Sequence, residues 1–196
     1  MKRLFIPALL AAALVIAGCS QNRANPRDEN GENQSTAGQD TAGGSNNGNT
    51  NALNPEDKGF AQKAATGGQA EVALGNLALQ KASDPKVKEF AQRMVTDHGQ
   101  AGQQLDQIAS KKDLDLPKMV PTEAQEEQDK LSKLSGPAFD QEYMRYEVQD
   151  HKQDVQDFQK AQNEVSDPDL KQFASQTLPI IEQHLKMAQQ IEGKEK

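Results

Sequence analysis

Four long stretches of the chain place apolar residues every three or four positions, which is the spacing of a helix that buries one face. Strand-like alternation of apolar and polar residues is almost absent. The pattern predicts long helices over about 55–82, 85–111, 138–165 and 168–192, and a shorter helix over about 122–134. Residues 55–192 are therefore expected to form an all-α domain, an antiparallel four-helix bundle with the short extra helix crossing between the second and third long helices.

The two pairs of long helices are punctuated in the same way. Ser-Asp-Pro occurs at 83–85 and again at 166–168, and in both places Phe-Ala follows at the same distance. The aspartate can cap the next helix, and a proline suits the first helical turn. The repetition indicates an internal duplication of a helical hairpin. Aligning Phe60 with Phe139 extends the similarity toward the start of each hairpin but requires a small gap.

On each predicted long helix, the line of inward-facing apolar residues forms a seam. Each seam carries one ionisable residue near its middle. These residues are Glu71 on the first long helix, His98 on the second, His151 on the third and His184 on the fourth. Counted from the Ser-Asp-Pro turns, the two members of each hairpin fall at nearly one level along the axis. Four-helix bundles build metal and cofactor sites from side chains placed in this way. The four residues are therefore candidate metal ligands.

Two interpretations of this layer stay open. A buried carboxylate or imidazole is costly unless it is paired, so the layer either binds a metal ion or satisfies itself and fixes helix register. No histidine has a glutamate three residues before it, which disfavours a carboxylate-bridged di-iron centre. A histidine-rich site suits zinc, copper or nickel better than a carboxylate-rich site does. Asp97, Asp150 and Glu182 are candidates for additional ligands or for acceptors that orient a histidine.

The first residues predict export and lipidation. Lys2 and Arg3 precede a short apolar stretch, and the small residues before Cys19, the single cysteine, match a bacterial lipobox. Residues 1–18 are expected to be a lipoprotein signal peptide, and the lipidated Cys19 to anchor the protein to a membrane. Ser20 is compatible with the periplasmic face of the outer membrane in a Gram-negative cell. Residues 19–54 predict a flexible polar tether, and residues 193–196 a short tail.

Charge and motifs narrow the function further. The formal charge is −7, and removal of the two cations in residues 1–18 would bring it to −9, which disfavours nucleic-acid binding. No complete catalytic motif is present, so an enzyme is less expected than a binding or structural protein. Gly67 and Gly68 fall inside the first predicted helix, where close helix packing would explain them.

Several segments resemble a bacterial family of unknown function, DUF4142: Met94–His98, Phe139–Met144, Asp150–His151 and Leu178–Pro179 with His184–Leu185. The resemblance covers about residues 59–191. It implies an exported, often lipidated protein with a ferritin-like bundle and no established activity, and the family's motif histidines correspond to the three histidines here. The function expected is metal binding by an envelope lipoprotein, with zinc, copper, nickel or iron as the ion. The alternative is a structural, stress-related or interaction protein that contacts other envelope proteins.

Overall fold

The computed structural model describes residues 53–193, and the regular secondary structure in that range is all helical. Five helices follow one another along the chain: α1 (Pro55–Lys81), α2 (Pro85–Lys111), α3 (Thr122–Ser132), α4 (Gly136–Glu164) and α5 (Pro168–Glu192). The all-α four-helix bundle with a short extra helix between the second and third long helices is confirmed. The predicted signal peptide, Cys19, nearly all of the tether and the last three residues of the tail lie outside the described residues.

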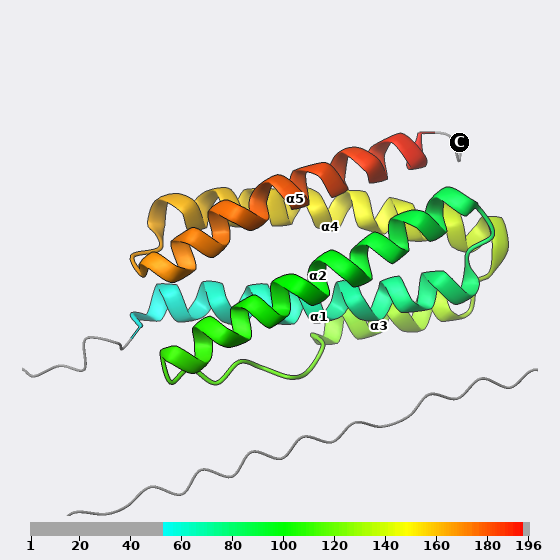
Figure 1. The fold of residues 1–196 in the computed structure, drawn as a ribbon. Helices are drawn as coiled ribbons and strands as arrows, with labels where there is room; N and C mark the ends of the chain where they lie inside the picture. The colour runs from blue at the N-terminus through cyan, green and yellow to red at the C-terminus, as the bar shows by residue number, and fades with distance from the viewer. Residues whose placement is uncertain (1–52, 194–196) are drawn as a thin grey trace, which may run out of the picture. The chain divides into compact units, whose positions relative to one another are not determined.

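Two helical hairpins make up the bundle (Figure 1). Helix α1 packs chiefly on α2, and α4 on α5, while α2 with α5 and α1 with α4 join the hairpins. The short helix α3 lies against α1 and α4 and leads the chain from one hairpin to the other. Each long helix therefore turns one face toward the other three, as the sequence pattern predicted.

The expected helix starts are confirmed in detail. The side chains of Asn54, Asp84 and Asp167 each accept a hydrogen bond from a backbone N–H in the first turn of the helix that follows. A proline follows each of them at the start of the helix, where its missing N–H costs nothing. Helix α4 begins two residues earlier than expected, at Gly136, which has a φ of 60° that glycine adopts without strain.

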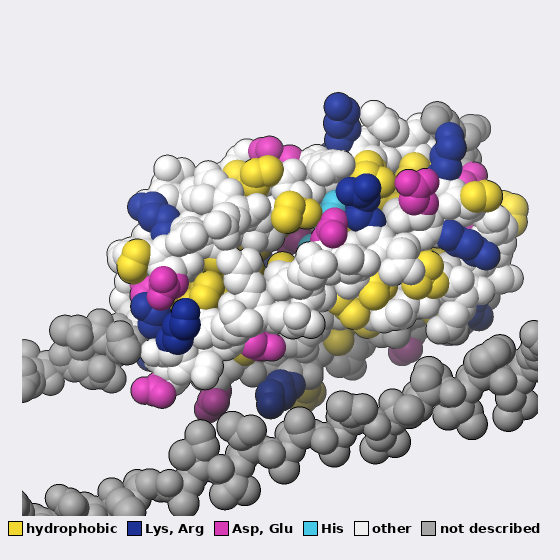
Figure 2. Space-filling view, viewed as in Figure 1, with side chains coloured by type: hydrophobic (Ala, Val, Ile, Leu, Met, Phe, Trp, Pro, Cys, Tyr) yellow, Lys and Arg dark blue, Asp and Glu magenta, His cyan; other side chains and the backbone are white. Residues whose placement is uncertain are grey.

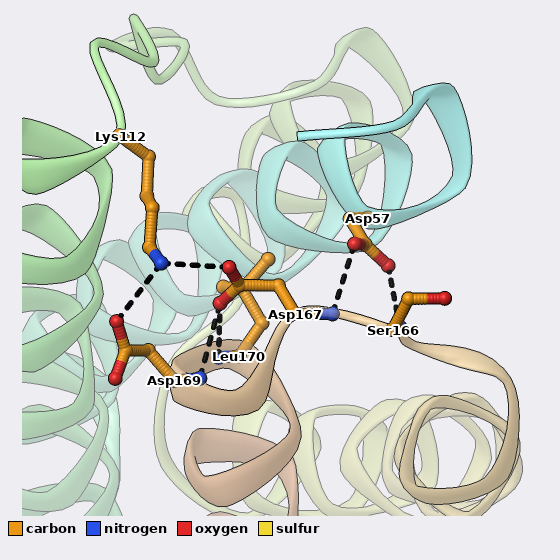
Figure 3. Close-up of polar contacts among 6 residues, drawn as sticks. All are labelled: Asp57, Lys112, Ser166, Asp167, Asp169 and Leu170. Carbon is orange, nitrogen blue, oxygen red and sulfur yellow. Dashed lines mark hydrogen bonds and ion pairs between the residues drawn. The ribbon is translucent and has the colours of Figure 1, made fainter. Parts of the chain in front are cut away.

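A pair of buried aspartates ties each hairpin to the turn of the other. Asp57 on α1 accepts hydrogen bonds from the backbone N–H groups of Ser166 and Asp167, at 2.9 and 3.0 Å (Figure 3). Asp140 on α4 does the same for the N–H groups of residues 83 and 84, and it also accepts from the Ser83 hydroxyl. Both aspartates and both turns are 83 residues apart. The duplication thus needs no gap, and Phe60 aligns with Tyr143 rather than with Phe139.

Lys112 strengthens one of these turns. Its Nζ lies 2.7 Å from an oxygen of Asp167 and 3.1 Å from one of Asp169 (Figure 3). These two carboxylates raise the pKa of Lys112, and hydrogen bonds from Lys112 and from the first turn of α5 hold the pKa of Asp167 below its usual value although partial burial opposes this. The end of α2 is thereby fixed to the start of α5.

The apolar core is divided into two parts along the bundle. One part lies around Phe90, Met94, Phe139 and Tyr143, and the other around Leu105, Phe158, Phe173 and Ile181. The two parts are separated on α2 by the residues between Met94 and Leu105 and on α5 by those between Ile181 and Ala188, and these stretches carry His98 and His184. A polar layer therefore crosses the bundle between two apolar halves.

The packing explanation for Gly67 and Gly68 is wrong. A Cβ added at Gly67 would meet nothing within 4 Å, and at Gly68 it would only approach a ring nitrogen of His98 at 4.0 Å. The close approach of α1 to α2 occurs instead at Gly75, where an added Cβ would lie 2.9 Å from Val95 and 3.0 Å from a backbone oxygen of α2. The sequence does not distinguish Gly75 from the other glycines of this helix, because its close approach depends on where Val95 and the α2 backbone lie in the folded bundle.

None of the helices within residues 53–193 combines the length and the apolar character that a membrane span requires. This observation concerns the bundle and leaves the predicted lipid anchor untested.

Candidate metal centre

The three histidines meet in the polar layer. Their ring centroids are separated by 5.4 to 5.8 Å, although α2, α4 and α5 each supply only one of them. One ring nitrogen of each histidine lies within 4.8 Å of a ring nitrogen of each of the other two. All three side chains are buried, His151 and His184 almost completely. The prediction that His98, His151 and His184 lie on the inward faces of their helices is therefore confirmed.

Each histidine has a buried ring nitrogen with no hydrogen-bond partner. These atoms are His98 Nε2, His151 Nε2 and His184 Nδ1. A buried polar atom without a partner costs on the order of 1–3 kcal/mol, and three of them in one layer are a substantial cost. A metal ion accepts lone pairs from such nitrogens, and Zn–N bonds of about 2.0–2.1 Å would be within reach after small side-chain rotations.

The opposite nitrogens of two of these rings lie close to carboxylates. His184 Nε2 lies 2.8 Å from an oxygen of Asp97, the neighbour of His98 on α2. His151 Nδ1 lies 3.3 Å from an oxygen of Glu147 and 3.1 Å from the backbone oxygen of the same residue. A carboxylate that accepts from one ring nitrogen fixes the tautomer and leaves the other nitrogen free to bind a metal. Asp97 thus has the geometry expected for a residue that orients a histidine.

Glu147 was not among the residues predicted from the sequence. The di-iron motif places a glutamate three residues before a histidine, whereas Glu147 lies four residues before His151. Positions i and i+4 share a face of a helix, so the Glu147–His151 pair was visible in principle. Its side chain is completely buried, and both carboxylate oxygens are without a hydrogen-bond partner.

Glu71 lies in the polar layer but next to Glu147 rather than at the centre of the three histidines. Ligand atoms of Glu71, Glu147 and His151 all lie within 4.8 Å of one another, which makes a second group that shares His151 with the first. Glu71 is 1% exposed, and neither of its oxygens has a hydrogen-bond partner. Asp150 is half-buried and faces Glu71 rather than a histidine, since the two carboxyl groups interact.

Glu182 is separated from this layer. Its side chain is exposed on α5, and within the described part of the chain it makes no hydrogen bond or ion pair to a histidine. Glu182 is two residues before His184, and residues at that spacing point in different directions from a helix. Of the three predicted neighbours, Asp97 contacts a histidine, Asp150 contacts Glu71, and Glu182 contacts neither.

Burial keeps two of the histidines neutral. It lowers the pKa of His98 well below the ordinary value, and the neighbouring histidines lower it further. Burial also lowers the pKa of His184 to about 4, although the hydrogen bond to Asp97 opposes the change. For His151 the effect of Glu147 outweighs that of burial, and the pKa is raised. Neutral imidazoles at His98 and His184 keep their lone pairs available to a metal ion at neutral pH.

Burial shifts the pKa values of carboxyl groups in and beside the layer upward, opposite to its effect on the histidines. Burial raises the pKa of Glu71 well above its ordinary value, and the charges of Glu147 and Asp150 raise it further. Burial likewise raises the pKa of Asp154 to about 7, with a contribution from Asp150. Tyr143 is fully buried beside Glu147, and its pKa is raised by burial and by that carboxylate. The layer therefore holds more carboxyl groups than its surroundings can stabilise as anions.

A small cavity reaches the layer from the side of His98. It has a volume of about 40 Å³, and its lining includes His98, Gly67, Gly68, Gly102 and Asp154. Figure 2 shows one face of the bundle, with charged side chains scattered over it without a broad patch of either sign and a few histidine atoms visible among them. The histidines are therefore close to the surface although they are buried.

A profile of the family described as "Domain of unknown function (DUF4142)" matches residues 42–191. The chain belongs to the DUF4142 family. That match includes the three histidines, Glu71 and Glu147. Among curated proteins, no relative matches this DUF4142 chain.

Solved structures share the fold of this DUF4142 protein. A DUF305 fragment from Deinococcus radiodurans matches with a TM-score of 0.66 at 13% identity, covering 73% of this chain and 99% of that one. A DUF305 protein from Streptomyces coelicolor matches with a TM-score of 0.63 at 15% identity, covering 71% and 92%. CopM in its Cu(I)-bound form matches with a TM-score of 0.58 at 17% identity, covering 68% and 93%. At these identities the likeness establishes the helical-bundle fold.

Proposed function

We propose that this DUF4142 domain binds one Cu(I) ion through His98, His151 and His184. The observation that carries the proposal is that three buried histidines from three different helices each place a ring nitrogen within 4.8 Å of a ring nitrogen of the other two. Each of them also has one buried ring nitrogen without a protein partner. Imidazole nitrogen is a ligand that copper and zinc accept readily. The protein would act by holding the ion in a closed, water-poor layer.

The choice of copper among the candidate ions rests on a comparison. CopM, which shares the bundle fold, has been solved with Cu(I) bound and with silver bound. A site whose three ligands are imidazoles, with no carboxylate among them, also suits a monovalent ion, because no negative charge is needed to balance it. Zinc, nickel and iron remain the competing ions to be measured beside copper.

Binding of Ag(I) or Cu(I) is the first measurement. The full chain, purified without a histidine tag and with Cys19→Ser to remove the thiol, is expected to take up one equivalent of Ag(I), or of Cu(I) in anaerobic competition with a chromogenic chelator. His98→Ala in the same background removes a ligand and should weaken binding by about 100-fold or more, since even residues that only orient a ligand contribute about 10–100-fold.

Glu182→Gln provides the matched control, because Glu182 is two residues from His184 and does not contact a histidine. It should bind both ions as the parent protein does. A parent protein that binds none of copper, silver, zinc, nickel or iron would overturn the proposal. The polar layer would then serve helix register, and the envelope-interaction alternative would take its place.

We also propose that the bundle is lipid-anchored through Cys19 at the periplasmic face of the outer membrane. The lipobox supports this proposal, and the Streptomyces coelicolor protein of similar fold is described as a candidate secreted protein. In cells fed labelled palmitate, the wild-type chain should incorporate label and Cys19→Ala should not. Ser20→Asp should retain the label but move the protein to the inner-membrane fraction. Equal labelling of wild type and Cys19→Ala would contradict the anchor.

A further inference from the structure

A second group of potential ligands lies beside the histidine triad and differs from it in chemistry. It consists of Glu71 on α1 with Glu147 and His151 on α4, and its ligand atoms lie within 4.8 Å of one another. Glu71 and His151 are 1% and 0% exposed, and Glu147 is 0% exposed. The group offers two carboxylates and one imidazole, whereas the triad offers imidazoles alone.

The four carboxylate oxygens of Glu71 and Glu147 show that the group is incomplete without a further atom. All four are buried, and none has a hydrogen-bond partner among the described residues. Two carboxylates so close in a protein interior repel one another strongly. Of these two carboxylates His151 pairs with Glu147, at 3.3 Å, and it can balance at most one negative charge. A second positive charge is therefore required, either as a metal ion or as a bound proton.

We propose that Glu71, Glu147 and His151 form a second cation site, for a divalent ion that accepts both oxygen and nitrogen ligands, such as Zn²⁺. Carboxylate and imidazole together are a common ligand set for Zn²⁺, with bonds of about 2.0–2.2 Å. Asp150, half-buried next to Glu71, can supply a fourth oxygen or hydrogen-bond a bound water. The site thus differs from the triad in the charge of the ion that it favours.

Carboxylates also lead from the surface to this group along one face of α4. Asp157 is partly exposed and pairs with Lys63 at 2.6 Å, Asp154 lies one turn further in, and Asp150 one turn beyond that. Residues three and four apart share a helix face, so these side chains follow one another toward Glu147. Beyond the Lys63–Asp157 ion pair, a positive ion therefore meets the carboxyl groups of Asp154 and Asp150, which favour its approach.

The experiment isolates the acidic site by removing the other two histidines. Because His151 belongs to both groups, the double substitution His98→Ala/His184→Ala, with Cys19→Ser, destroys the triad and leaves Glu71, Glu147 and His151 in place. Titration calorimetry of this full chain with Zn²⁺ should show one bound equivalent. Adding Glu71→Gln and Glu147→Gln keeps the shape of both side chains and should weaken Zn²⁺ binding at least 100-fold.

The outcomes separate this proposal from the one on the triad. Absence of Zn²⁺ binding in the double histidine variant, or Zn²⁺ binding unchanged by the glutamine substitutions, would overturn the second site and leave a proton between the carboxylates. Glu71→Gln/Glu147→Gln in a chain with all three histidines should keep the helical circular dichroism spectrum of the parent chain, which shows that the variant folds. Failure of the triad would appear instead as an Ag(I) affinity that His98→Ala does not change.

Discussion

Asp140→Ala should lower the free energy of unfolding by about 3 kcal/mol, because it leaves several donors at one turn without their acceptor. The Asp140 carboxylate is 1% exposed and accepts from the backbone N–H groups of Ser83 and Asp84 and from the Ser83 hydroxyl. Hydrogen bonds to a charged group contribute more to stability than neutral ones, about 1.5–3 kcal/mol each, although water can replace part of this after the substitution. Urea unfolding followed by circular dichroism measures the change.

The duplication supplies a matched comparison. Asp57→Ala removes the equivalent bonds at the other turn, where two backbone N–H groups donate, and should cost about 2 kcal/mol. Asp129→Ala, at an exposed position on α3, should change stability by less than about 0.5 kcal/mol. A loss below about 1 kcal/mol for Asp140→Ala would mean that water satisfies the turn and that the aspartate pair contributes little to joining the hairpins.

Phe90→Ala is expected to cost about 3–5 kcal/mol, the usual range for removing a fully buried phenylalanine. The ring is completely buried in the part of the apolar core that also contains Met94, Phe139 and Tyr143, and it lies next to the histidines. Its centroid lies 6.1 Å from that of His151 and 6.5 Å from that of His184. The substitution therefore opens a cavity under two proposed ligands, and Ag(I) affinity should fall by about tenfold, as when other supporting residues of a metal site are lost.

Phe173→Ala tests whether the effect on binding is specific. Phe173 is 2% exposed in the other half of the core, where its ring neighbours are Phe60 and Phe158. It should lose similar stability in thermal unfolding and keep the parent affinity for Ag(I). Equal loss of Ag(I) affinity in both variants would show that general loosening of the bundle, rather than support of the histidines, controls binding.

Much of the fold could be predicted because the helices are amphipathic and their ends carry clear signals. The Ser-Asp-Pro turns placed two helix starts correctly, and the seams placed three histidines on the inner faces of their helices. These predictions succeed because the helical period and the capping preferences are local properties of the chain. The gap in the duplication was wrong, since the equivalent aspartates contact turns in the opposite hairpin, and such a contact leaves no local signal.

The candidate site was predicted less completely. The sequence indicated a single layer of Glu71 and three histidines, whereas the structure divides it into a histidine triad and an acidic group that includes Glu147. A seam defined by apolar neighbours omits Glu147, because that residue lies at the border of the α4 seam and reaches the interior only where α1 packs beside it. Glu182 shows the reverse error, since closeness in sequence to His184 does not give closeness in space.

The sequence by itself determined the helices, their caps and the inward faces of His98, His151 and His184, because each depends on residues within a few turns of one chain segment. Only the tertiary structure decided which ring nitrogens meet and which carboxylates accept from them. It also decided which glycine allows α1 and α2 to approach closely. These features depend on the rotation and relative height of four helices, which are set by the packing of the whole core.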